Sequence, residues 1–276
     1  ELGEITDEMI KEFNASQDKY EVKGVYKGNY DEAMTAAIAA FRAKQHPNLI
    51  QIFEVGTASM MAAKGAVRPV YEIMEAAGTP VDTSKLLGSV ASYYSSTDGK
   101  LIAMPFNAST TVLYYNKDAV KKAGGDPEHF PTTWPEVAEL AKKIKESGAC
   151  KYGFTSGWQS WVQLESFSAW HNVPFATNNN GYDGLDTKLL FNSPLHVKHI
   201  DFLSKLQKDG VMVYVGRKSE AINAFTSGEA GILMNSSGSY AAVKAGAKFQ
   251  WWCIEVKHFN CLNELSSDET FVCWGR

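Results

Sequence analysis

Two tryptophans stand three residues apart in the segment SGWQSWVQLESFSAW, directly after a Ser-Gly turn. If a helix begins near Trp158, then Trp161 lies on the same face of that helix. Paired indole rings offer a flat apolar surface against which the C–H groups of a polyol can pack. The alternative is that the two rings pack between layers of the fold, as we expect for Trp170. The pair is therefore either a ligand platform or part of the core.

A run of small polar residues, NSSGS, follows the apolar segment AGILM (230–234) and precedes a helical segment. Hydroxyl groups and unpaired amides at the start of a helix suit a phosphate or a carboxylate, without needing Lys or Arg. Ser236 is the first hydroxyl of this run. The alternative is an ordinary serine N-cap, which needs no ligand.

Glu54 comes directly after the apolar run LIQIF (49–53). A carboxylate buried at the end of a strand needs hydrogen-bond partners, and the hydroxyl groups of a ligand could supply them. An exposed Glu in a loop would need no such explanation. Tyr30 and Ser109 are unremarkable when they are considered alone.

Motifs of catalysis are nearly absent. The segment GFTSG (153–157) resembles a nucleophile elbow but has Thr at the nucleophile position, and the spacing of Gly210 and Gly216 departs from a phosphate-binding loop. His196 and His199 have the i, i+3 spacing of a metal pair, but two exposed histidines on one helix explain the pattern as well. We therefore predict that the chain is not an enzyme, and we expect no cofactor and no metal.

The size and the charge of the chain exclude further classes of protein. The chain has 276 residues, of which 45% are hydrophobic and 21% charged, and a net charge of −4. This length accommodates two domains, and the composition is that of an ordinary globular protein. No cluster of Lys and Arg indicates a nucleic-acid partner. No apolar run approaches the roughly 18–20 residues that a membrane span needs.

Short predicted strands alternate with helices. We predict strands at 20–26 and 49–53, and helices at 30–45 and from residue 57, after a first helix with Ile5, Met9 and Phe13 on one face. This alternation favours parallel strands with helices on both faces of the sheet.

The second half has the same style. Thr133 and Glu136 have the spacing of a capping box, and Val137, Leu140 and Ile144 form the apolar stripe of the helix that follows. We predict a further buried strand at 230–234.

The segment MPFNASTTVLYYNKDAVKKAG (104–124) joins the halves. A polar loop leads into a β-rich run, which passes at once into a new helical unit, as happens where a chain crosses between two α/β lobes. In such sheets ligands bind beyond the carboxyl ends of the strands. The loops at these ends are rich in Ser, Asn, Gly, Tyr and Trp.

This crossover resembles that of the bacterial extracytoplasmic solute-binding proteins, the ligand-capturing subunits of ABC importers. The resemblance runs through residues 1–249, and the Trp-containing run and FEVGTASMMA are specific to the branch that binds glycerol 3-phosphate. It includes the segments YKGNYDEAMTAAIAAFRA and YVGRKSEAINAFTSGEA.

The resemblance implies an α/β fold of the two-lobe periplasmic-binding-protein type (type II), with each lobe a sheet flanked by helices, incomplete here. We expect a partial first lobe at 1–109, a second lobe at 110–250 and a non-family tail at 251–276. Family members begin with a strand upstream of Glu1 and continue beyond residue 250, and that part supplies an Arg at the phosphate. Glu1 is thus expected to be a cut end. The tail is expected to come from a shifted reading frame, a fusion scar or a gene-model error, or else to be a genuine divergent terminus.

The resemblance also implies the function. The protein would capture glycerol 3-phosphate, or a glycerophosphodiester, by hinge closure and deliver it to the transmembrane subunits of the importer, as a periplasmic or extracytoplasmic monomer without a cofactor. The implied ligand-binding residues are Tyr30, Glu54, Ser109, Trp158, Trp161 and Ser236. Glu54 would accept hydrogen bonds from the glycerol hydroxyls, the other hydroxyl groups would donate, and the indole rings would cover the carbon skeleton. The alternatives are a sugar- or oligosaccharide-binding protein of the same superfamily and a phosphodiester-hydrolysing enzyme.

Overall fold

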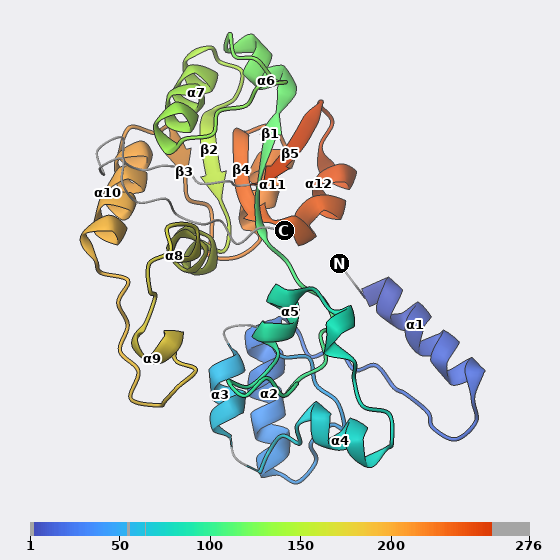
Figure 1. The fold of residues 1–276 in the computed structure, drawn as a ribbon. Coiled ribbons are helices and arrows are strands. Elements are labelled where there is room, and N and C mark those ends of the chain that lie inside the picture. The colour runs from blue at the N-terminus through green and yellow to red at the C-terminus, as the bar shows by residue number, and fades with distance from the viewer. Residues whose placement is uncertain (1–2, 54–55, 64, 256–276) are drawn as a thin grey trace. The chain divides into compact units, whose positions relative to one another are not determined.

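The computed structural model describes residues 3–53, 56–63 and 65–255 of the chain (Figure 1). Contacts divide the chain into two compact units. The first unit comprises Glu1–Ala108 and Gly181–Leu185, and the second comprises Ser109–Asn180 and Asp186–Arg276. The passage from one to the other falls inside the predicted crossover segment.

The described part of the first unit is mainly helical. Its α-helices are α1 (Gly3–Ser16), α2 (Tyr30–Arg42), α3 (Thr57–Ala62), α4 (Val70–Ala76) and α5 (Gly88–Tyr93). At the start of α2 the side chain of Asn29 accepts a hydrogen bond from the Glu32 amide, and the Glu32 carboxylate accepts one from the Asn29 amide at 2.8 Å. This capping box fixes where the helix begins. The predicted helix at 30–45 is confirmed, although it ends at Arg42.

The two strands predicted in this unit are wrong. Residues 20–26 and 49–53 have irregular backbone, and Tyr26 and Leu49 are 89% and 85% exposed. In the described part of this unit, strand-like pairing is limited to an isolated bridge between Ser95 and Leu101. A β-rich sequence forms a strand only when a neighbouring strand accepts its hydrogen bonds.

The predicted apolar stripe of α1 exists, but it is not buried. The side chains of Ile5, Met9 and Phe13 are 55%, 52% and 44% exposed. Helices α2, α4 and α5 likewise bury none of their residues. Helices α1, α2, α4 and α5 therefore share little of the core packing from which most helical stability comes.

The second unit is built on a five-stranded sheet with the order β3-β2-β4-β1-β5. The strands are β1 (Thr111–Asn116), β2 (Tyr152–Ser156), β3 (Met212–Val213), β4 (Ala230–Ser236) and β5 (Trp251–Glu255). Strand β2 pairs in parallel with β3 and β4, whereas β1 is antiparallel to both β4 and β5. The strands predicted at 230–234 and at the crossover are confirmed, but the sheet is mixed and not purely parallel.

Helices cover both faces of this sheet (Figure 1). The α-helices of this unit are α6 (Lys117–Lys122), α7 (Trp134–Glu146), α8 (Ser166–Trp170), α9 (Thr177–Asn180), α10 (Pro194–Lys208), α11 (Glu220–Thr226) and α12 (Tyr240–Gly246), of which α9 lies away from the sheet. Leu113 of β1 faces a core built with α6, α7 and α10, while Tyr114 faces a second core built with α11 and α12. This alternation follows from the two-residue period of a strand. The α/β class is thus confirmed.

Helix α7 shows how local sequence sets an element. The Thr133 side chain accepts a hydrogen bond from the Glu136 amide, and the Glu136 carboxylate accepts one from the Thr133 amide at 3.2 Å. The stripe of Val137, Leu140 and Ile144 is buried. Both features were predicted. Among the residues that the structure describes, no helix combines the length and the apolar character that a bilayer crossing requires.

Strand β5 lies in a segment that the sequence assigned to a separate tail. Its residues pair with β1 from Val112 opposite Glu255 to Asn116 opposite Trp251. These five residues therefore belong to the sheet of the second unit. Residues 256–276, the rest of the predicted tail, lie outside the described residues.

Burial predicts a large difference between two isoleucine substitutions. Ile144→Ala empties a fully buried site and should lower the free energy of unfolding by about 2–5 kcal/mol. Ile5→Ala changes a side chain that is 55% exposed and should shift it by no more than about 0.5 kcal/mol. Urea unfolding followed by circular dichroism measures both, and equal losses would contradict the burial described above.

Candidate ligand-binding site

One edge of the second unit's sheet collects the polar loops that the sequence singled out. Because β2 and β4 are parallel and β1 is antiparallel to β4, the carboxyl ends of β2 and β4 lie at the same edge as the amino end of β1. Ser156 ends β2, Ser236 ends β4 and Thr111 begins β1. The segments at 109–110 and 157–158 therefore meet the turn that follows β4. We call this edge the serine–tryptophan edge.

Ser109 and Ser236 lie close together at this edge. Thr111 pairs with Ser236, and just outside the strands the Ser237 amide donates to the Thr110 carbonyl at 2.8 Å. A Cβ built on Gly238 would lie 3.3 Å from the Oγ atoms of both Ser109 and Ser236. Both hydroxyl groups thus flank a glycine, where the backbone leaves room that a side chain would fill.

The amides of this turn are already used. The Ser237 amide is bound to the Thr110 carbonyl, and the Gly238 amide donates to Ser236 Oγ at 3.0 Å. Ser236 is therefore an N-cap, as the plainer interpretation of the sequence expected. A hydroxyl that accepts one hydrogen bond still has a proton to donate. At Ser237 and Gly238 the turn thus offers a ligand hydroxyl groups rather than free amides.

The turn at 157–161, which carries Trp158 and Trp161 and which we call the tryptophan turn, adjoins the end of β4. The Gly157 amide donates to the Met234 carbonyl at 3.1 Å, and the Trp158 amide donates to the Lys218 carbonyl at 3.2 Å. Trp158 has φ = 49°, in the left-handed region that a bulky residue rarely adopts. Helical backbone begins at Gln159. A π-helical turn, Trp161–Glu165, comes next. Both conformations are uncommon, and both occur preferentially at functional sites.

The rings of Trp158 and Trp161 are half-buried. Each packs in part against the core that lies between the sheet and α7. The two interpretations of the sequence are therefore not exclusive, since one part of each ring stabilises the core while the other part stays accessible. Trp170, expected in the core, is also half-buried against it.

The histidine pair of α10 contradicts its prediction. His196 and His199 are only 1% and 2% exposed, not surface residues. His196 lies between the hydroxyl groups of Ser168, at 2.8 Å, and Ser193, at 2.7 Å. His199 Nε2 lies 3.0 Å from the Gln163 side-chain oxygen. The two rings thus have separate partners, and within the described ranges no group of three His, Cys, Asp or Glu side chains is placed to hold a metal ion.

Burial also sets the charge of these rings. Desolvation, with a smaller contribution from His171, lowers the pKa of His196 and lowers that of His199 to about 3. Both imidazoles are therefore neutral at pH 7. Because the Gln163 oxygen can only accept, His199 carries its proton on Nε2.

The other two predicted site residues belong to the first unit. Tyr30 begins α2, is 38% exposed, and stacks on Phe53 with ring centroids 5.1 Å apart. Glu54 lies outside the described residues. The structure therefore brings together Ser109, Ser236 and the tryptophan turn, and the roles of Tyr30 and Glu54 stay predictions.

Sequence reasoning missed two contributors to this edge. The loop at 214–219 supplies the Lys218 carbonyl that binds the Trp158 amide. Gly157 is equally constrained, because a Cβ there would lie 2.6 Å from that carbonyl and 2.7 Å from Asn235 Nδ2. Strand β3 before this loop has only two residues, too few for a recognisable pattern.

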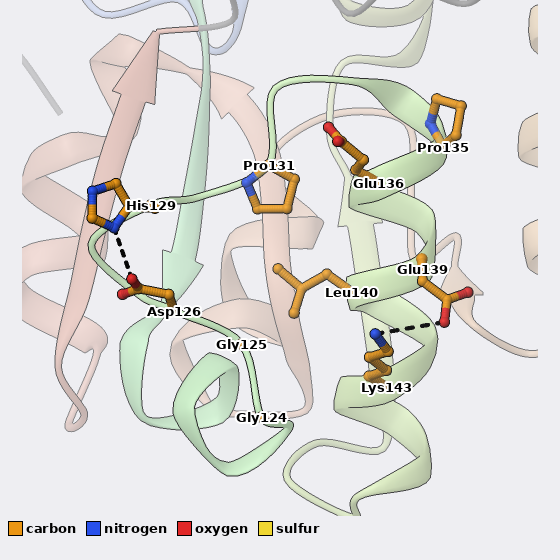
Figure 2. A pocket seen from close by; sticks show the side chains of 10 residues that line it. All are labelled: Gly124, Gly125, Asp126, His129, Pro131, Pro135, Glu136, Glu139, Leu140 and Lys143. Carbon is orange, nitrogen blue, oxygen red and sulfur yellow. Dashed lines mark hydrogen bonds and ion pairs between the residues drawn. The ribbon is translucent and has the colours of Figure 1, made fainter.

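A separate hollow of about 440 Å³ lies against α7 (Figure 2). It is at the opposite edge of the sheet, since α6 and the loop after it follow the carboxyl end of β1. Four of its side chains form ion pairs, Asp126 with His129 at 2.7 Å and Glu139 with Lys143 at 3.8 Å, and Glu136 caps the start of α7. None of the predicted ligand-binding residues lines it.

A family model described as bacterial extracellular solute-binding protein matches residues 8–259. The chain belongs to this family. The resemblance inferred from the sequence is thus confirmed, and the match extends past residue 249, where we expected it to end. Solute binding is what the family's description names, in agreement with the expectation of a binding protein and not an enzyme.

The curated relatives are similar over most of this chain. It is 51% identical over 248 residues to the sn-glycerol-3-phosphate-binding periplasmic protein UgpB of Brucella abortus (strain 2308). It is 49% identical over 252 residues to the protein of that name from Escherichia coli (strain K12). These matches cover 90% and 91% of the chain but only 57% of each relative. The chain therefore spans little more than half the length of these relatives.

Solved structures share the fold. UgpB from Mycobacterium tuberculosis in complex with glycerophosphocholine superposes with a TM-score of 0.77 at 21% identity, covering 93% of this chain and 64% of that one. Maltose-bound MalE3 of T. maritima gives a TM-score of 0.72 at 18% identity, covering 92% and 64%. These are substrate-binding proteins of the two-lobe type, so the predicted fold class is confirmed.

The buried histidines predict acid sensitivity. Unfolded histidine takes up a proton near pH 6.5, whereas folded His199 does so only near pH 3, so the unfolded state binds more protons between these values. Stability should be complete above about pH 6.5 and fall toward pH 3, with His199 contributing up to about 1.4 kcal/mol per pH unit. Urea unfolding at pH 7 and pH 5 tests this, and His199→Gln should flatten the slope. An unchanged slope in this variant would contradict the assignment.

Proposed function

We propose that the intact protein captures glycerol 3-phosphate, or a glycerophosphodiester, between two lobes and delivers it to the transmembrane subunits of an ABC importer. It would act as a monomer in the periplasm or an equivalent extracytoplasmic compartment. Membership in the solute-binding family and the identity of about half the residues to UgpB proteins support this proposal. The observation that carries it is the meeting of Ser109, Ser236 and the tryptophan turn at one sheet edge.

The chemistry of this edge suits a phosphorylated polyol. Serine hydroxyls donate hydrogen bonds to phosphate or hydroxyl oxygens. Half-buried indole rings cover a carbon skeleton and lose little side-chain entropy when they do so. From the first unit, Tyr30 would add another hydroxyl, and Glu54 would accept hydrogen bonds from the glycerol hydroxyls. Glu54 would lie at the end away from the phosphate, because two anions in contact repel each other.

The free energy of binding determines how many such contacts are needed. A hydrogen bond contributes about 0.5–1.5 kcal/mol, or about 1.5–3 kcal/mol when one partner is charged. A micromolar complex corresponds to about −8 kcal/mol. Two serine hydroxyls and two indole rings supply only part of this, so both lobes must contact the ligand. Closure of a hinge around the ligand meets this requirement.

Titration calorimetry on the full-length protein tests the ligand. Glycerol 3-phosphate and glycerophosphocholine should bind, and Trp158→Ala should weaken binding by about tenfold or more through loss of aromatic contact area. The control is Trp252→Ala, because Trp252 is 59% exposed and pairs with Tyr115 away from the serine–tryptophan edge. It should leave the affinity within about twofold. Binding of maltose alone would favour a sugar receptor, and turnover of a glycerophosphodiester would favour an enzyme.

A second titration tests the carboxylate. Glu54→Gln keeps the size of the side chain but loses a charged acceptor, so affinity for glycerol 3-phosphate should fall by about tenfold or more. Inorganic phosphate should compete equally well in the wild type and in this variant, since Glu54 is placed at the hydroxyl end. Stronger competition or unchanged affinity would count against that placement.

A further inference from the structure

A buried chain of hydrogen bonds connects α10 to the tryptophan turn. His199 Nε2 donates to the Gln163 side-chain oxygen at 3.0 Å, and the Gln163 amide donates to Ser156 Oγ at 2.9 Å. Ser156 is the last residue of β2 and directly precedes Gly157. His199 and Gln163 are 2% exposed, and Ser156 is fully buried. Water therefore cannot replace these bonds when one of them is lost.

The partners of Gln163 fix its orientation. Its amide nitrogen also lies 3.3 Å from the sulfur of Met234, a weak acceptor, and its oxygen faces the Nε2 proton of neutral His199. The reverse orientation would leave its oxygen facing the Met234 sulfur, which cannot donate. The Met234 sulfur therefore favours the orientation in which the Gln163 amide nitrogen faces Met234 and Ser156.

The ring of His199 is fixed as well. It stacks on Phe167 with ring centroids 4.0 Å apart and forms a T-shaped contact with Trp134, with ring centroids 5.0 Å apart. These contacts orient the donor nitrogen, as a rigid support does for groups that must keep one geometry.

The segment that this chain of bonds supports has two uncommon backbone conformations. Trp158 is left-handed, and Gln163 itself lies in the π-helical turn that begins at Trp161. Such conformations persist only when the surrounding structure holds them in place. The hydrogen bonds of Gln163 support both conformations. One of them reaches Ser156, two residues before the left-handed Trp158, and Gln163 itself lies in the π-helical turn, two residues after Trp161.

We propose that Gln163 and His199 are a buried pair of positioning residues that holds Trp158 and Trp161 in their ligand-binding geometry. Neither residue would touch the ligand. The inference concerns affinity for the ligand and rests on the proposed function. The effect of Gln163 and His199 on the position of the two indole rings can be measured without any ligand.

The test uses one substitution at three positions of the full-length protein. Gln163→Met keeps an unbranched side chain of similar length and removes the hydrogen bonds. His199→Met replaces the imidazole ring with an apolar side chain and removes its hydrogen bond together with its contacts to Phe167 and Trp134. His196→Met is the matched control, since His196 is on the same helix, is equally buried and also loses two hydrogen bonds, but has no bond to Gln163. His199→Gln is the conservative variant, because its amide can still donate to Gln163.

Two readouts are measured, the indole N–H resonances of Trp158 and Trp161 without ligand and the Kd for glycerol 3-phosphate. Gln163→Met and His199→Met should shift both resonances and weaken binding by about tenfold. His196→Met should lower the melting temperature to a similar extent while leaving the resonances and the Kd unchanged. His199→Gln should have resonances and a Kd closer to those of the wild type than His199→Met has.

The proposal is overturned if the Gln163 and His199 variants only lose stability, or if His196→Met shifts the resonances equally. Should the methionine variants fail to fold, His199→Gln decides, since a shift of both resonances there would contradict a role for the donated bond. If the wild type binds no glycerol 3-phosphate, the proposed function fails, and the resonances still decide whether the pair positions the rings.

Discussion

The antiparallel pairing of β1 with β4 is the constraint on which the rest of the second unit depends. It places Thr111 opposite Ser236, so the chain that enters β1 passes beside the turn that leaves β4. Both strands are almost completely buried, so their register is set by packing on two faces. A slip by one residue would invert every side chain of β1 and separate Ser109 from Ser236. The position of the two hydroxyls therefore follows from the backbone ladder and not from their own contacts.

Behind this edge lies a group of buried polar side chains. His196, His199 and Gln163 are buried, yet each has a hydrogen-bond partner, and both imidazoles are neutral. A buried neutral network stabilises one arrangement of its members and avoids the desolvation of a charge. The tryptophan turn borders this interior on one side and the accessible edge on the other. Its rings thus contact both the core and the surface that is proposed to bind the solute.

Sequence predicted those features that are decided locally. The capping box of Thr133 and Glu136 and the continuous apolar run of β4 were visible because their signals lie within a few residues. The serine and tryptophan loops were found because ligands collect at strand ends. Burial of His196 and His199 was missed because their partners, Ser168 and Gln163, lie about thirty residues away in sequence, a separation no periodicity reveals. The strands expected at 20–26 and 49–53 failed because propensity cannot supply a neighbouring strand.

A crystal structure of the full-length protein with glycerol 3-phosphate tests the central claim most directly. The account predicts the ligand at the serine–tryptophan edge, with the hydroxyl groups of Ser109 and Ser236 at hydrogen-bonding distance, about 2.5–3.0 Å from its oxygens. The ring of Trp158 should lie within about 4 Å of its carbon atoms. A ligand bound instead in the hollow beside α7, or contacting neither serine nor Trp158, would contradict the account.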